Sequence, residues 1–143
     1  MKIPIPKKSY EWKFDVLEIL DVHDADTCKL KIDMGFGIYA IQYFRLYGIN
    51  APEITGTPEY EKSDLFKLAQ KAKMYLLNRL NKAMEAKQKI EVQVVKKEKF
   101  GRWLAIILIN KKNVNEELLN KGFARFYMGI GSKDLVWKNY KGV

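Results

Sequence analysis

Asp26-Thr-Cys-Lys-Leu-Lys-Ile-Asp33 alternates between apolar and polar residues along its whole length. The residues on its apolar side are Cys28, Leu30 and Ile32. An alternation with a period of two is typical of a β-strand that is buried on one face. Met34-Gly-Phe-Gly37 then reads as a turn, and Ile38 to Tyr47 returns as a second strand. This stretch predicts a β-hairpin.

Three further strands are predicted on either side of this hairpin. Trp12 to Val22 is apolar-rich and β-branched enough to form a strand before it. Ile90 to Val95 and Arg102 to Asn110 form two more, joined by a turn over residues 96–101. The first three strands therefore form a meander, and the last two form a second hairpin.

Two helices are expected between and after these strands. Ser63 to Ala86 predicts a long helix with Ser63 as its N-cap. Its apolar residues recur at helical spacing, with lysines on the opposite face; they are Leu65, Leu68, Ala69, Ala72, Leu76 and Leu80. A short helix is predicted over 115–122, with Asn115 as its N-cap and Gly122 in the left-handed position that ends a helix.

The order of elements is three strands, a long helix, two strands and a short helix. This order predicts an α+β fold built on a five-stranded OB-fold β-barrel, which is a common platform for nucleic acids. The chain has no internal repeat and no linker, so residues 1–143 are expected to form one domain. Residues 1–11 are interpreted as a basic leader and residues 129–143 as a flexible tail.

The charge balance is strongly basic. Lysine and arginine number 26 against 17 acidic residues, which gives a net charge of +9. Such an excess favours polyanionic partners, nucleic acid first and an anionic membrane second. A lysine-rich surface with no such partner is the alternative.

Cysteine usage and hydropathy exclude several classes of protein. Cys28 is the single cysteine, which excludes an internal disulfide and argues against a cysteine-based zinc site. No apolar run is long enough for a signal peptide or a membrane span, so no membrane partner is expected. If Met1 is the natural start the protein is expected in the cytoplasm, whereas a removed signal peptide would make it secreted.

Two aspartates precede the first hairpin strand. Asp26 has the parity of the buried row, so its carboxylate is expected to face the barrel interior, where it needs a cation or hydrogen bonds. Asp24 adds to this acidic patch. The oxygen ligands, without a second histidine beside His23, indicate Ca²⁺ or Mg²⁺. The alternatives are a strand-end Asp26 satisfied by backbone N–H groups and a His23 that serves only the surface or packing.

Arg45-Leu-Tyr-Gly-Ile-Asn-Ala-Pro-Glu53 places a strand-borne guanidinium ahead of a loop carboxylate. Glu53 is the candidate general base, since a carboxylate near a metal can take a proton from an attacking water. Arg45 and Arg102 offer planar forks that match the oxygens of a phosphoryl group. Each arginine alone is also compatible with a surface ion pair, and Glu53 with an ordinary exposed residue.

Four ordered blocks of this chain resemble the staphylococcal nuclease (thermonuclease) family. The blocks are Asp24-Ala-Asp-Thr-Cys-Lys-Leu30, Phe44-Arg-Leu-Tyr-Gly-Ile-Asn-Ala-Pro-Glu53, Lys99-Phe-Gly-Arg-Trp-Leu-Ala105 and Val114-Asn-Glu-Glu-Leu-Leu-Asn-Lys-Gly-Phe-Ala-Arg125. The resemblance covers roughly residues 14–127 and implies a Ca²⁺-dependent phosphodiesterase that acts on DNA and RNA.

The resemblance also implies a role for individual residues. On the metal side it implies Asp26 as a direct ligand, Asp24 as a ligand through water, Asn50 at a carboxylate position and Ala51 through its backbone carbonyl. On the substrate side it implies Glu53 at the attacking water, Arg45 and Arg102 on the scissile phosphate, and Lys99 and Tyr127 near the terminal phosphate or the base.

The chain departs from the family pattern at four places. Asn50 replaces a carboxylate with a neutral amide, which predicts weaker metal binding. Ala51 lacks a hydroxyl, and Phe100 lacks a phenolic oxygen. The residues after Tyr127 are too few for the long C-terminal helix of the best-known member, so the predicted fold lacks that helix.

Two functions therefore remain open. The first is a monomeric, metal-dependent endonuclease that uses Ca²⁺, or alternatively Mg²⁺, to cut single-stranded or frayed DNA, with RNA as an alternative substrate. The second is an OB-fold module that binds single strands through its basic surface and aromatic side chains but has weak or no catalysis. Asn50 favours the second, whereas the joint presence of Asp26, Arg45, Glu53 and Arg102 favours the first.

Overall fold

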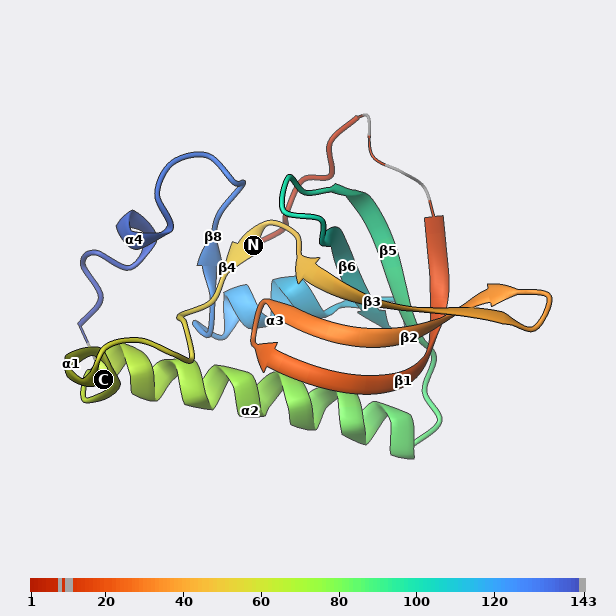
Figure 1. The fold of residues 1–143 in the computed structure, drawn as a ribbon, viewed down its shortest axis with the longest axis horizontal. Helices are drawn as coiled ribbons and strands as arrows, with labels where there is room; N and C mark the ends of the chain where they lie inside the picture. Colours follow the sequence, from red (N-terminus) through yellow and green to blue (C-terminus); the bar gives the residue numbers. More distant parts are fainter. Residues whose placement is uncertain (8, 10–11, 142–143) are drawn as a thin grey trace.

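The computed structural model describes residues 1–7, 9 and 12–141. Parts of the predicted leader and tail, residues 8, 10–11 and 142–143, lie outside the described residues. Five long strands form the barrel (Figure 1): β1 (Trp12–Asp24), β2 (Thr27–Gly35), β3 (Ile38–Leu46), β5 (Ile90–Lys97) and β6 (Trp103–Ile109).

The five strands close into a barrel in the order β3-β2-β1-β5-β6. Neighbouring strands are antiparallel, except that β3 pairs with β6 in parallel, with Phe44 opposite Trp103 and Leu46 opposite Ala105. This parallel pairing joins the two edges of the sheet at the end of β3 and closes the barrel there. The predicted α+β fold with a five-stranded OB-fold barrel is confirmed.

Strand β1 is longer and more irregular than the predicted Trp12 to Val22. Its register against β2 shifts three times, and the last shift lies between Val22 and Asp24. Each shift leaves one residue of β1 without a partner on β2, which bends the strand and increases its twist. His23 is the extra residue of the last bulge, so the simple alternation of the strand does not hold at this end.

The barrel is surrounded by several short elements, and these short elements were not predicted from the sequence. They are β4 (Ile49–Asn50), which pairs with β8 (Arg125–Phe126), β7 (Lys112–Asn113), which pairs with β6, and the one-turn helices α1 (Pro58–Glu61) and α4 (Lys133–Val136). Helix α4 lies within the predicted flexible tail, whose mobility stays a prediction.

The long helix α2 (Asp64–Glu85) lies along one side of the barrel against β1 (Figure 1). Ser63 is its N-cap as predicted, since its hydroxyl accepts a hydrogen bond from the backbone N–H of Phe66 at 3.1 Å. Its buried face is rich in small residues and consists of Ala69, Ala72, Leu76, Leu80 and Ala83. Among the described residues, no helix has the length and hydropathy needed to cross a membrane.

The short helix α3 (Val114–Asn120) corrects one prediction. Its N-cap is Asn113, not Asn115, because the Asn113 side chain accepts the hydrogen bond from Glu116 N. Asn115 is fully buried and joins α3 to the barrel: its amide donates to the carbonyls of Tyr47 and Ala105. Gly122 follows the helix with φ of 79°, the left-handed conformation expected of it.

The barrel interior is apolar and continuous with the buried face of α2. Cys28, Leu30 and Ile32 are buried there as predicted, and burial raises the pKa of the Cys28 thiol to about 12. The start of the chain also contributes, because Ile3 is buried and its side chain occupies the space that a Cβ on Gly48 would need. Ile3 is held there by its backbone N–H, which donates to the Glu116 carboxylate at 2.6 Å.

Candidate active site

The predicted site residues gather at one mouth of the barrel because four segments end there. The β1–β2 turn carries the two aspartates, the end of β3 carries Arg45, and β4 with the following loop carries residues 50–53. Strand pairing sets their order, since Thr27 lies opposite Arg45 and Arg45 lies opposite Leu104 of β6. Arg102 therefore reaches the same mouth from the start of β6.

Asp26 is buried, with 4% of its surface exposed, and has a partner on each carboxylate oxygen. Its Oδ2 accepts a hydrogen bond from Ala51 N at 2.8 Å and lies 3.2 Å from Nη1 of Arg45. Its Oδ1 accepts a hydrogen bond from the Thr27 hydroxyl at 3.0 Å. Burial alone would raise the pKa of Asp26, but the Arg45 charge and these hydrogen bonds outweigh it and lower the pKa. Asp26 is therefore an ionised carboxylate. One of its hydrogen bonds comes from a backbone N–H, in partial agreement with the alternative that backbone N–H groups satisfy this strand-end aspartate.

Asp24, Glu53 and His23 form an acidic cluster beside Asp26. One potential ligand atom from each lies within 4.8 Å of the other two. Asp24 is 2% exposed, and its Oδ1 accepts a hydrogen bond from Asp26 N at 3.1 Å. Burial, and next the neighbouring Asp26 charge, raise the pKa of Asp24 to about 9. The neighbouring Glu53 charge adds to this rise.

Arg45 is the centre of the site and is almost fully buried. Its Nη1 donates to the carbonyls of Leu46 and Ile49 at 3.3 and 3.0 Å, and its Nη2 donates to Asn50 Oδ1 at 3.3 Å. A guanidinium has five N–H donors. Two of the five are therefore without a hydrogen-bond partner in the part of the chain that the structure describes, and the side chain lines a pocket.

Arg102 is held on two sides. Glu98 accepts two hydrogen bonds from it, from Nε at 2.6 Å and from Nη2 at 3.1 Å. Its Nη1 donates to the Thr27 hydroxyl at 3.4 Å, and that hydroxyl in turn donates to Asp26. The two arginines are thus linked through Thr27 and Asp26 into one polar network.

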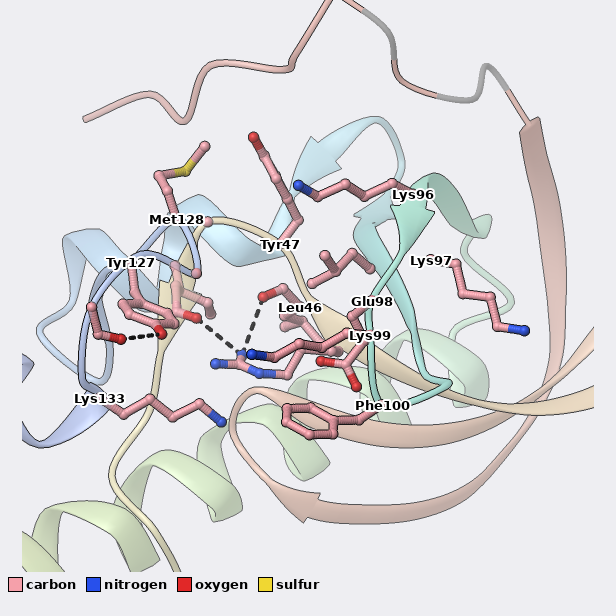
Figure 2. A pocket seen from close by; sticks show the side chains of 16 residues that line it. Leu46, Tyr47, Lys96, Lys97, Glu98, Lys99, Phe100, Tyr127, Met128 and Lys133 are labelled. Atoms are coloured by element: carbon pink, nitrogen blue, oxygen red, sulfur yellow. Dashed lines mark hydrogen bonds between the residues drawn. The ribbon is translucent and has the colours of Figure 1, made fainter.

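A pocket of about 400 Å³ opens in front of Arg45 (Figure 2). Lys99 and Lys133 point into it, whereas Lys97 points away. Tyr127 forms another wall, and its hydroxyl donates to the carbonyl of Gly131 at 3.0 Å. The structure therefore brings both predicted substrate-binding residues, Lys99 and Tyr127, to one pocket with Arg45.

Glu53 lines a second pocket, of about 390 Å³. Asn50 and Ala51 line this pocket too, so the predicted metal-binding loop faces it. Lys133 lines both pockets and so marks the border between them.

Sequence reasoning missed the contributions of two residues. His23 is exposed as interpreted, but the β-bulge brings it to Asp24 and Glu53. Glu98 was not singled out, although it is the only acidic residue in the lysine-rich turn before Arg102. That isolated acid beside an arginine was the signal available for Glu98, whereas nothing in the sequence marked the bulge.

Comparison with known proteins agrees with this geometry. The family model described as staphylococcal nuclease homologue matches residues 43–140. The chain belongs to the staphylococcal nuclease family. It is also 32% identical, over 130 residues, to an uncharacterized protein of Methanocaldococcus jannaschii. That match covers 78% of this chain but 58% of the relative, so the chain spans little more than half the length of that protein.

Proposed function

We propose that this member of the staphylococcal nuclease family is a metal-dependent endonuclease that hydrolyses phosphodiester bonds of single-stranded or frayed DNA, with RNA as an alternative substrate. The observation that carries the proposal is the polar network that joins Arg102, Thr27, Asp26 and Arg45 at the mouth where Glu53 also lies. Two cations and several carboxylates at one mouth suit a reaction that needs a cation-stabilised phosphate and an activated water.

The acidic side of the mouth fits a hard divalent cation. Asp24 and Glu53 offer carboxylate oxygens within one cluster. Asp26 is not part of that cluster, and both of its oxygens already have partners. Asn50 offers an amide oxygen that already accepts one bond from Arg45. Oxygen donors of this kind suit Ca²⁺, with Mg²⁺ as the alternative. The raised pKa of Asp24 supports the fit, because a nearby cation would favour its ionised form. A bound cation would neutralise negative charge that develops on the phosphate.

The remaining residues supply orientation and proton transfer. Arg45 lines the first pocket, and Arg102 is oriented by Glu98 and joined to Arg45 through Thr27 and Asp26. The proposal assigns both forks to the non-bridging oxygens of one phosphate. Glu53 would orient the attacking water and take its proton as the new bond to phosphorus forms. The bond from phosphorus to the leaving oxygen breaks, and that oxygen takes a proton from solvent. Lys99 and Tyr127 would hold the adjoining nucleotide.

A single-strand-binding module without catalysis is the second candidate. Asn50 favours it, because a neutral amide stands where the family's best-known member has a carboxylate ligand. Basic side chains around the first pocket would serve either function. The acidic cluster argues against a pure binder, since carboxylates facing a polyanion weaken its binding unless a cation lies between them.

A cleavage assay separates the two candidates. A labelled single-stranded DNA is incubated with the protein in Ca²⁺ and then in excess chelator, and each sample is run on denaturing and native gels. The proposal predicts shortened strands in Ca²⁺ and intact strands in chelator. Strands that are retarded on the native gel but uncut under both conditions would favour the binding module.

A further inference from the structure

We propose that the second pocket, which contains Glu53, is a binding site for the nucleobase on the opposite side of the scissile phosphate from the Lys99–Tyr127 pocket. The inference rests on the proposed function, since a phosphodiester at the barrel mouth carries one nucleoside on each side. One nucleoside faces the first pocket. The other must leave the phosphate in another direction, and the second pocket lies there beside Glu53, Asn50 and Ala51.

The second pocket has the size and lining that a base requires. Its volume of about 390 Å³ lies within the range of small-ligand pockets. Much of its wall is aromatic or aliphatic and is formed by Pro52, Tyr60, Leu65 and Trp137. Aromatic walls bind any base through stacking, which suits an enzyme that acts without strict sequence preference.

Tyr60 is fixed in position relative to the catalytic loop. Its hydroxyl donates a hydrogen bond of 2.7 Å to the backbone carbonyl of Glu53. Its ring packs edge-on against Phe66, with 5.9 Å between the ring centroids. Gly56 lies directly against the ring, so that a Cβ at Gly56 would collide with Tyr60. A base on this ring would therefore be held at a set place beside the Glu53 loop.

Trp137 forms another part of the wall and carries a donor without a partner among the described residues. Its side chain is held by Arg125, whose guanidinium carbon lies 4.6 Å from the indole ring centroid and whose Nη1 donates to the carbonyl of Val136 at 2.8 Å. Trp137 is 8% exposed, and its indole N–H has no hydrogen-bond partner in the described part of the chain. An unpaired buried donor is costly. Because this N–H is itself buried, an oxygen or ring nitrogen of a bound nucleobase would accept from it only after the Trp137 ring shifts.

Lys133 connects the second pocket with the first. It lines both pockets, and Figure 2 shows its side chain pointing toward the first. A strand that runs from Tyr127 across the mouth to Trp137 would pass this ammonium group with its backbone phosphate. The polarity of the strand is left to the experiment.

A dinucleotide with one phosphodiester fixes the register and tests the inference. The probes are a 5′-phosphorylated thymidine dinucleotide and two versions in which either base is replaced by hydrogen. Their binding is measured by calorimetry in chelator, so that the result does not depend on hydrolysis. Trp137→Leu should weaken binding of the complete dinucleotide about tenfold, the loss typical of removing a base–aromatic stack. One of the two abasic dinucleotides lacks the base that would occupy the second pocket. Trp137→Leu should barely affect binding of that dinucleotide.

Controls separate a specific loss from a folding defect. Tyr60→Leu should reproduce the effect from the other wall, and Trp137→Phe should keep most of the stacking while losing the N–H contribution. Trp12→Leu, at a half-exposed tryptophan that does not line the pocket, should leave binding unchanged.

Each outcome decides between the possibilities. An equal loss on all three probes, no loss on any, or no detectable binding of the complete dinucleotide to the wild type would overturn the inference. If binding depends on the base but no strand is ever cut in Ca²⁺, the proposed hydrolysis fails while the second pocket stands. If strands are cut but Trp137→Leu acts alike on every probe, the hydrolysis stands and the second pocket fails.

Discussion

Arg45 and Asp26 form an ion pair inside the barrel mouth, with 3.2 Å between Nη1 and Oδ2 and only 5% of each side chain exposed. The pair joins the acidic half of the site to its cationic half. Because both groups are removed from water, each depends on the other for charge balance. This ion pair therefore contributes both to the stability of the fold and to the proposed catalytic site.

Replacing Arg45 should destabilise the protein as well as inactivate it. Arg45→Met leaves Asp26 buried without its counter-ion, which typically costs about 3–5 kcal/mol. Urea unfolding followed by circular dichroism measures the change. Lys67→Ala is the matched control, since its ion pair with Asp64 is 68% and 63% exposed and should contribute less than about 1 kcal/mol. Similar small losses for both variants would contradict the buried pair's role.

Removing the charge of Glu98 should lower activity through Arg102. Glu98→Gln can accept only one of the two hydrogen bonds from Arg102, so the guanidinium would lose its fixed orientation. We expect kcat to fall about tenfold or more, the kind of loss that a misplaced catalytic group causes, while gel-shift affinity changes little. Glu85→Gln, at an exposed position on α2, is the control. Unchanged kcat in Glu98→Gln would mean that Arg102 needs no such support.

The raised pKa of Asp24 should make metal-free stability depend on pH. Burial, followed by the Asp26 charge, raises this pKa from 3.8 to about 9. The folded protein thus holds the proton more tightly than the unfolded chain does. This contribution to stability is complete below about pH 4 and is lost as the pH rises through about 9.

Asp24→Asn removes that dependence and provides the test. In chelator, the Tm of the variant minus that of the wild type should grow steadily between about pH 5 and about pH 9. Saturating Ca²⁺ should shrink the difference, because a bound cation favours the ionised Asp24 of the wild type. A Tm difference that stays constant over this range would show that Asp24 titrates normally.

Asn50→Asp should strengthen metal activation. The substitution adds a negative charge to the oxygen set while the new carboxylate can still accept the hydrogen bond from Arg45 Nη2. We expect the Ca²⁺ concentration for half-maximal cleavage to fall about tenfold or more, since ligand charge tunes Ca²⁺ affinity over orders of magnitude. Asn50→Ala removes the side-chain oxygen altogether and should raise the Ca²⁺ concentration for half-maximal cleavage. Equal half-saturation points for wild type and Asn50→Asp would refute the assignment of Asn50 to the metal site.

The regular parts of the fold were predictable because their sequence periods are simple. The alternation through Cys28 to Ile32 and the helical stripe of α2 each report one buried face, and both were confirmed. The meeting of Arg45 with Asp26 followed from the strand order, because β2 and β3 pair beside the first turn. The barrel closure between β3 and β6 then brings Arg102 to them.

The rest of the site depends on contacts that no local pattern encodes. Asn115 was predicted as a helix N-cap because asparagine favours that position. Its side-chain amide instead donates hydrogen bonds to two backbone carbonyls of the barrel, those of Tyr47 and Ala105. His23 lies in a bulge, which breaks the alternation on which its interpretation relied. The wall formed by Trp137 depends on the contact of its indole ring with the Arg125 guanidinium of β8, which is distant from it in the local sequence pattern.

The most direct test of the central claim is the cleavage rate of a labelled single strand by wild type, Glu53→Gln and Arg102→Ala in saturating Ca²⁺, with strand affinity measured in parallel. We predict chelator-sensitive cleavage by the wild type, a loss of about a hundredfold or more in each variant, and affinities that stay within a few-fold. Cleavage that persists in both variants, or a wild type that binds the strand without cutting it, would contradict the claim that these residues form one hydrolytic site.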